Sequence, residues 1–232
     1  LFFKYLTKKS LDNCDLYTVT SFCDKDFLLK NFSEKYSSKI KIRSNWVDTK
    51  KNIQTKNKNL INTIVSVGRI ENQKNYELII RSIKGTNYEL DIYGEGSLKN
   101  ELKKLSQELN VTVNFLGIVN NETLVEKLQN YKFYISSSVY EGNPKSVLEA
   151  MSAGCIVIAS KIKNHLEFLN SNNSILFDKN ITSLKEAIMH LDKISQTRND
   201  DLVNNSLETI NNKYNLNDLV KKEIKDINNL VM

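Results

Sequence analysis

Short apolar runs alternate with helical patterns from residue 60 onward, and this alternation restricts the possible folds more than any other feature of the chain. Each apolar run has the length of a buried strand, and each segment between two runs repeats apolar residues at the spacing of a helix face. The predicted strands are 61–68, 87–94, 111–117, 132–138 and 155–160. The predicted helices between them are 75–85, 97–110, 121–130 and 144–153. Strands that alternate with helices predict an α/β fold, a Rossmann-like doubly wound parallel sheet. Ser97 is the expected N-cap of the second helix.

The segments on either side of this alternation differ from it. The first 59 residues contain one predicted β-α-β unit, with strands 15–22 and 39–48 and a helix over 25–36. A single unit cannot cover both faces of its own strands, so it either joins an edge of the main sheet or ends a preceding domain. After residue 160 the predicted elements are a short helix over 164–170, a strand over 174–178, and closing helices over 183–194, 199–211 and 216–231.

The formal net charge of +6 favours an acidic partner, such as nucleic acid, an anionic membrane or a phosphorylated small molecule. The lysines are scattered among asparagines and glutamates, and the densest basic run, 48–59, is typical of a solvated linker. A nucleic-acid surface would need a clustered basic stripe, so nucleic acid is not an expected partner.

No metal site is predicted. Cys14, Cys23 and Cys155 share no metal-ligand spacing, and we expect them to be reduced, buried thiols. His165 and His190 have no carboxylate or cysteine at ligand spacing, so neither is assigned a metal or catalytic role.

The opening stretch, "LFFKYLTKKS", is apolar and then basic, which is the reverse of a secretory signal. It lacks an initiator Met, and we expect the chain to be part of a longer one. Leu1, Phe2, Phe3 and Leu6 would then pack against a missing domain, or the stretch would lie at a membrane surface as an interfacial helix. Exposed, these residues would favour self-association.

Candidate binding residues follow the predicted strands. A doubly wound sheet binds ligands outside the carboxyl ends of its strands. The loop after the first strand holds Gly68, Arg69 and Lys74, and the loop after the second begins at Gly94. Glycine permits close approach of the backbone to a ligand, and two cations beside it suit a diphosphate.

The helix that starts near Pro144 predicts an anion site. Proline suits a first helical turn, and the free amides of the next three residues, Lys145, Ser146 and Val147, would point at an anion. Two carboxylates, Glu141 on the loop and Glu149 within the helix, flank that site. Carboxylates accept hydrogen bonds from sugar hydroxyls, so a diphosphate with hydroxyl-rich groups at both ends would fit. Each of these residues alone is more often a surface charge or a turn residue, and the prediction rests on their agreement at one sheet edge.

Two stretches carry a family resemblance: "VSVGRIENQKN" (65–75) and "SSSVYEGNPKSVLEAMSAGCIVIAS" (136–160). Together they resemble the donor-binding half of retaining GT-B glycosyltransferases of group 1, a family-4-like type, with a Glu-x7-Glu motif at Glu141 and Glu149 and a G-R-x4-K pattern at residues 68–74. "SKIKIRSNWVD" (38–48) is similar to the segment that joins the two domains of that family. The implied organisation is a remnant of the N-terminal acceptor domain over 1–45, a linker over 46–59, the donor-binding domain over 60–195 and closing helices over 196–232.

The resemblance implies roles for residues of this sequence. The donor would be a nucleotide sugar, most often UDP-linked, bound by the following residues: Gly68, Arg69, Lys74, Gly94, Glu141, Gly142, Asn143, Pro144, Lys145, Ser146, Val147 and Glu149. Arg69 and Lys74 would neutralise the diphosphate leaving group, and Glu149 would bind the ribose. Glu141, with the backbone of residues 142 and 143, would hold the transferred sugar. Arg69, Lys74 and Glu141 are the implied catalytic residues.

The resemblance also implies the setting of the reaction. The sugar would be transferred with retention to a glycan or lipid-linked acceptor in bacterial cell-surface polysaccharide biosynthesis, such as that of capsule or lipopolysaccharide. No cofactor or metal is expected. The enzyme would be cytoplasmic, with peripheral contact at the inner face of the cell membrane as a further expectation.

The sequence departs from the family pattern in two places. The stretch after the strand 155–160 lacks the usual glycines, and nearly all of the N-terminal domain is missing. Because closure of two domains excludes water and completes such sites, we expect this chain alone to be weakly active or inactive. The alternatives are a nucleotide-sugar epimerase of the same architecture and a non-catalytic basic module. The sequence leaves the sugar, base, acceptor, linkage and oligomeric state open.

Overall fold

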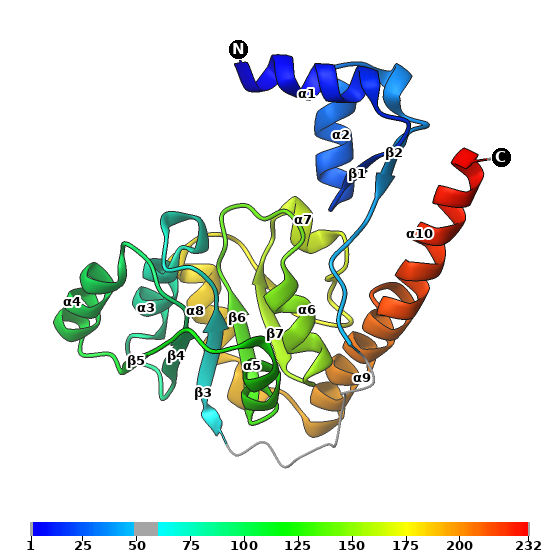
Figure 1. The fold of residues 1–232 in the computed structure, drawn as a ribbon. Helices are drawn as coiled ribbons and strands as arrows, with labels where there is room; N and C mark the ends of the chain where they lie inside the picture. Colours follow the sequence, from blue (N-terminus) through cyan, green and yellow to red (C-terminus); the bar gives the residue numbers. More distant parts are fainter. Residues whose placement is uncertain (1, 49–59, 232) are drawn as a thin grey trace.

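The computed structural model describes residues 2–48 and 60–231, and Figure 1 shows the arrangement of their elements. Most of the predicted linker, and Leu1 of the opening stretch, lie outside the described residues. Residues 2–42, referred to below as the N-terminal unit, lie at one end of the molecule. Residues 43–48 run from this unit along the sheet domain, which is formed by residues 60–231.

The sheet domain is built on one parallel sheet of six strands. These strands are β3 Leu60–Val67, β4 Glu89–Tyr93, β5 Val113–Gly117, β6 Tyr131–Ser136, β7 Ile156–Ser160 and β8 Ile175–Phe177. Their spatial order is β5-β4-β3-β6-β7-β8, and every neighbouring pair runs parallel. The predicted doubly wound sheet is therefore confirmed. The strand order reverses between β3 and β6, which is where such a sheet opens a crevice.

Helices cover both faces of this sheet (Figure 1). They are α3 Tyr76–Ile83, α4 Lys99–Leu109, α5 Asn121–Leu128, α6 Lys145–Ser152, the single-turn α7 Lys163–Leu166, α8 Ile181–Met189, α9 Gln196–Lys213 and α10 Leu216–Val231. Successive β3 residues point to opposite faces: Ile64 packs with the apolar residues of α3 and α8, and Val65 packs with those of α6 and α9. Val147, Leu148 and Met151 are fully buried on the second face, as an α6 core stripe requires.

Helix starts differ from their predicted positions for local reasons. Helix α4 begins at Lys99 after Leu98, so the prediction of Ser97 as its N-cap is wrong. The Ser97 hydroxyl and backbone amide donate to the carboxylate of Glu71 instead. Helix α6 begins at Lys145, with Pro144 as the N-cap residue rather than the first helical residue.

The N-terminal unit has a small sheet of its own. Its elements are α1 Phe2–Asn13, β1 Tyr17–Val19, α2 Phe22–Asn31, a 3₁₀ turn Glu34–Tyr36 and β2 Ile40–Ile42. Strands β1 and β2 pair in parallel and only with each other, so of the two expectations the one that joined this unit to an edge of the main sheet is wrong. A separate core of Leu11, Leu28, Tyr36 and Ile40 holds it together.

The chain leaves this unit at β2, earlier than the predicted strand end at residue 48. Arg43 pairs with Glu223 and Asp226 of α10, and the Val47 amide donates to the Tyr214 carbonyl 3.1 Å away. Helix α10 therefore borders the crossing segment, as Figure 1 shows.

Several apolar side chains are exposed on α1 and α10. On α1 these are Phe2, Phe3, Tyr5 and Leu6, and on α10 they are Val220, Ile224 and Ile227. Among the three cysteines Cys155 is buried, Cys14 and Cys23 are half-buried, and no disulfide joins them. The expectation of three buried thiols therefore holds for Cys155 alone.

None of the described helices is long and apolar enough to cross a membrane.

Candidate functional site

The loops that follow β3 and β6 meet at the carboxyl ends of these strands, where the strand order reverses. The Val139 amide donates to the Gln73 carbonyl over 2.9 Å. The Ser137 hydroxyl lies 2.7 Å from the carbonyl oxygen of Lys74 and 2.8 Å from that of Asn75. The two loops that carry the predicted catalytic residues are therefore held side by side.

Lys74 and Glu141 form the central ion pair of these loops. Lys74 ends a short 3₁₀ turn, Asn72–Lys74, and its Nζ lies 2.6 Å from Glu141 Oε1. The two side chains are only 16% and 8% exposed. Gly68 makes this contact possible, because a Cβ there would lie 2.7 Å from Lys74 Cε. The lysine side chain thus crosses over the glycine to reach the glutamate.

Further donors fix the Glu141 carboxylate. The Ser138 hydroxyl donates to Oε1 over 2.6 Å, and Gln73 Nε2 lies 3.4 Å from Oε2. Gln73 also donates to the carbonyl of Tyr140 over 2.9 Å. A carboxylate with one cation and two neutral donors is held in one orientation.

His165 lies beneath this cluster, although the sequence assigned it no role. It is fully buried, with Nδ1 2.8 Å from the Ser160 carbonyl oxygen and Nε2 3.4 Å from the Ser136 hydroxyl. The Ser136 hydroxyl lies 3.3 Å from that of Ser138, which donates to Glu141. Burial lowers the pKa of His165 and so favours the neutral imidazole. No spacing in the sequence connects residue 165 with residue 141, and only the packing of α7 against β6 and β7 does.

Glu149, the second carboxylate of the motif, is buried in α6. It is 5% exposed and accepts a hydrogen bond from Asn121 Nδ2 over 2.6 Å, while Lys145 Nζ lies 3.7 Å away. Burial raises the pKa of this carboxyl, and the Asn121 hydrogen bond and the charge of Lys145 oppose the rise. Asn121 begins α5, so the loop after β5 also reaches the site; the sequence analysis missed this residue.

The start of α6 offers fewer amides than expected. The Val147 amide donates to the Pro144 carbonyl over 3.1 Å, so it is not the free amide that the sequence predicted. The Ser146 hydroxyl accepts from the Tyr134 hydroxyl over 3.0 Å. Of the three backbone amides predicted to face an anion, those of Lys145 and Ser146 remain candidates.

Asn45 and Asn164 hold the loop of Gly142 and Asn143. The Asn45 amide donates to Asn143 Oδ1 over 3.0 Å, and Asn45 Nδ2 donates to the Asn143 carbonyl. Asn164 Nδ2, from α7, donates to the Gly142 carbonyl over 2.8 Å. The loop predicted to hold the sugar is therefore fixed from two sides.

Arg69 and Gly94 lie at the rim. Arg69 is exposed, and its guanidinium lies 3.3 Å from Gln73 Oε1, so it shares a loop with Lys74 without joining the ion pair. A Cβ on Gly94 would lie 2.0 Å from the Gly68 carbonyl oxygen, so only glycine lets the loops after β3 and β4 approach this closely. The structure thus brings the predicted residues of three loops to one edge of the sheet.

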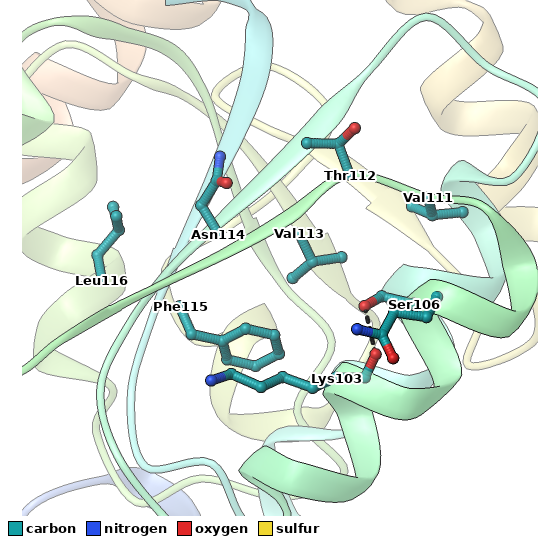
Figure 2. Close-up of a pocket in the computed structure, with 9 residues that line it drawn as sticks. Lys103, Ser106, Val111, Thr112, Val113, Asn114, Phe115 and Leu116 are labelled. Atoms are coloured by element: carbon teal, nitrogen blue, oxygen red, sulfur yellow. Dashed lines mark hydrogen bonds between the residues drawn. The ribbon is translucent and has the colours of Figure 1, made fainter.

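A cavity of about 620 Å³ lies elsewhere, between α4 and the edge strand β5 (Figure 2). Lys103 and Ser106 of α4 and Val113 and Phe115 of β5 line it, with Lys103 Nζ 5.8 Å from the centre of the Phe115 ring. None of the predicted site residues lines this cavity. Within residues 2–48 and 60–231, no group of three or more His, Cys, Asp or Glu side chains could hold a metal ion.

The doubly wound sheet has the GT-B glycosyltransferase fold. The crystal structure of TarM matches with a TM-score of 0.81 and 22% identity, over 96% of this chain and 45% of TarM. HepE from Anabaena, in complex with UDP and glucose, matches with a TM-score of 0.86 and 12% identity, over 97% of this chain and 66% of HepE. At these identities the likeness shows the fold alone.

The sequence comparisons define the family. Residues 48–208 match the glycosyl transferases group 1 family, and the chain belongs to it. One relative is the N-acetylgalactosamine-N,N'-diacetylbacillosaminyl-diphospho-undecaprenol 4-alpha-N-acetylgalactosaminyltransferase of Campylobacter jejuni, 31% identical over 69% of this chain and 45% of that protein. Another is the poly(ribitol-phosphate) alpha-N-acetylglucosaminyltransferase of Staphylococcus aureus, 29% identical over 63% of this chain and 30% of that protein. The chain thus spans less than half the length of these two curated relatives.

Proposed function

We propose that this chain is the donor-binding half of a retaining glycosyltransferase that uses a UDP-linked sugar. The observation that carries the proposal is the Lys74 and Glu141 ion pair at the point where the strand order reverses, beside the start of α6. Cations and a helix start at one edge of the sheet suit a diphosphate, and the two flanking carboxylates suit hydroxyl-rich groups on either side.

In this proposal the bond between the anomeric carbon and the diphosphate oxygen breaks, and its electron pair leaves with that oxygen. Arg69 and Lys74 stabilise the negative charge that develops on the diphosphate, in the place a metal ion would otherwise take. Glu141 and the backbone of Gly142 and Asn143 hold the sugar while the oxygen of the acceptor hydroxyl bonds to the anomeric carbon and its proton passes to the departing diphosphate oxygen.

Lys74 would change partners during this step. In the structure its charge is offset by Glu141, 2.6 Å away. An anionic diphosphate would compete for the ammonium, and Glu141 would then be available to sugar hydroxyls. Glu149, with Asn121, would bind the ribose.

Relatives support the choice of donor and acceptor. HepE has been crystallised with UDP and with UDP-glucose, and TarM with UDP. The names of the curated relatives specify an undecaprenyl-linked acceptor in one case and poly(ribitol phosphate) in the other. We therefore propose a glycan or lipid-linked acceptor and a role in cell-surface polysaccharide synthesis.

We further propose that the whole enzyme acts in the cytoplasm, at the inner face of the membrane. The exposed aromatic residues Phe2, Phe3 and Tyr5 on α1, interspersed with lysines, suit contact with an anionic lipid surface. Sedimentation with anionic vesicles, compared with neutral vesicles, tests this contact.

Calorimetric titration tests the donor site. We expect UDP to bind more tightly than GDP, and Arg69→Ala and Glu149→Ala each to weaken UDP binding about tenfold, since each removes a charged contact. Arg81→Ala is the matched control, because Arg81 is exposed on α3 and pairs with Glu77. Equal UDP affinity in all four proteins would contradict the proposal. A panel of UDP-sugars would then identify the donor.

A further inference from the structure

The N-terminus of α2 is capped by residues from both parts of the molecule. The Ser21 hydroxyl, within the N-terminal unit, accepts from the Asp24 amide over 3.0 Å. The two preceding amides, those of Phe22 and Cys23, donate to the carboxylate oxygens of Glu167 over 3.1 and 2.9 Å. Amides in the first turn of a helix have no acceptor within that helix, so the Glu167 carboxylate provides the hydrogen-bond acceptors for these two amides.

Glu167 comes from far away in the sequence. It follows α7 in the sheet domain, 145 positions from Phe22 and 144 from Cys23. Figure 1 shows α2 and α7 facing each other where the N-terminal unit meets the sheet domain. A carboxylate at a helix N-terminus also interacts favourably with the helix dipole.

A second residue of the same segment connects this contact to the donor loop. Asn164 Nδ2 lies 3.4 Å from the Ser21 hydroxyl and donates to the Gly142 carbonyl over 2.8 Å. Ser21 is fully buried, so this contact is enclosed. The side-chain amide of Asn164 therefore contacts both the N-cap residue of α2 and the loop that precedes α6.

We propose that Glu167 is a positioning residue that holds the N-terminal unit against the loop of Gly142 and Asn143. Glu167 holds the start of α2, where Ser21 is the N-cap residue. The side chain of Asn164 then joins Ser21 to the loop through its contact with the Gly142 carbonyl. The docking role of Glu167 follows from the geometry alone, whereas an effect of Glu167 on donor binding rests on the proposed function.

The reactivity of the Cys23 thiol reports on this docking. Its backbone amide is held by Glu167, and its thiol pKa is raised to about 11 by burial and then by the hydrogen bond and charge of Glu167. If the units separate, the thiol loses both influences and its pKa falls toward the ordinary value near 9. Alkylation requires the thiolate, so the rate at a fixed pH rises about tenfold for each unit by which the pKa falls.

The experiment uses the full chain with Cys14→Ser, so that Cys23 and the buried Cys155 are its remaining thiols. Iodoacetamide labelling of each cysteine is followed by mass spectrometry over a pH series. The variants are Glu167→Gln, which keeps the side-chain volume, and Glu167→Ala. Glu108→Gln, on the exposed face of α4, is the matched control.

We expect both Glu167 variants to label Cys23 at least about tenfold faster than the parent below the parent's pKa, with Cys155 still protected. The pH series separates the thiol pKa from the rate constant of the thiolate, and undocking should raise that rate constant as well, because it exposes Cys23. A lower pKa with an unchanged thiolate rate constant would reflect only the lost charge of Glu167 and would overturn the docking role. The control should match the parent. An unchanged Cys23 profile in both variants would overturn the proposal. Labelling of Cys155 together with Cys23 in Glu167→Gln would also overturn it, because Glu167 would then support the whole fold rather than the docking of one unit.

A separate titration tests the effect on the donor loop. We expect Glu167→Gln to weaken UDP binding about fivefold, the lower range of coupling between sites. If UDP binds the parent and the variant equally while the Cys23 profile changes, the part of the proposal that concerns the loop is wrong. If UDP does not bind the parent at all, the proposed function fails, while the labelling result on docking still stands.

Discussion

The ammonium of Lys74 lies 2.6 Å from the Glu141 carboxylate across two loops that are 67 positions apart in the sequence. With side chains only 16% and 8% exposed, neither charge can be hydrated fully. Each charge therefore depends on the other in this structure, and a ligand that draws one away must replace its partner.

Removal of Lys74 should expose this dependence. We expect Lys74→Met to lower the free energy of unfolding by about 2 to 3 kcal/mol, because it leaves a nearly buried carboxylate without a cation. Glu141→Gln in the same chain should recover most of that loss, since the amide carries no charge. Urea denaturation of the two single variants and the double variant measures the coupling. Additive losses would mean that the pair contributes nothing to stability.

Gly68→Ala should affect both stability and ligand binding. Its φ is +153° and the new Cβ would meet Lys74 Cε at 2.7 Å, so the end of the lysine side chain must shift. We expect a loss of about 1 to 3 kcal/mol in unfolding free energy from the backbone conformation, together with weaker UDP binding.

Gly85→Ala is the matched control for this variant. Gly85 has a φ of +77°, and the nearest atom to its Cβ would be Lys185 Nζ at 3.9 Å. It should lose comparable stability in thermal unfolding yet bind UDP normally by calorimetry. Normal UDP binding by Gly68→Ala would show that the placement of Lys74 does not matter to the ligand.

Glu149 should make stability fall as the pH rises. Burial raises its pKa above the ordinary value of 4.5, so the folded protein holds this proton more tightly than the unfolded chain. The stabilisation is complete below the unfolded pKa and is lost as the pH rises through the folded pKa. Glu149→Gln lacks this loss, so its stability relative to the parent should increase from pH 4 to pH 7.

Urea denaturation at both pH values measures this difference, with the exposed Glu108→Gln as control. A constant difference between Glu149→Gln and the parent would mean that Asn121 and Lys145 fully compensate for the burial of the carboxylate.

Trp46 should report ligand binding at α6. It is the only tryptophan of the chain, and Lys145 Nζ lies 5.3 Å from the centre of its ring. A diphosphate at the start of α6 would draw Lys145 away and remove this cation–π contact. We expect the emission at tryptophan excitation to change on titration with UDP.

The matched variant for this measurement is Lys145→Gln, which lacks the cation near Trp46. Its emission should be insensitive to UDP even where calorimetry still detects binding. An equal fluorescence change in this variant and the parent would place the source of the signal elsewhere.

Much of the sheet domain follows from local pattern. The six predicted strands of this domain, 174–178 included, and the helices between them appear near their predicted positions. Gly68, Lys74 and Glu141 also meet as expected, because parallel strands bring their carboxyl ends to one edge. The predicted roles of these residues in binding and catalysis stay predictions, as do the domain boundaries.

The misplaced details have a common cause. Whether Ser97 caps α4 or binds Glu71, and whether the Val147 amide is free or bonded to Pro144, depends on loop conformation. Loop conformation leaves no hydrophobic period in the sequence, so a pattern of apolar residues cannot predict it.

The sequence alone determined the α/β class, the strand-end loops and the family, because hydrophobic periodicity and short motifs are local properties of the chain. The tertiary structure alone decided that β1 and β2 form a separate sheet, that His165 lies beneath Glu141, and that Glu167 caps α2. These relationships join polar groups up to 145 positions apart, and each depends on how whole elements pack before any hydrogen bond can form.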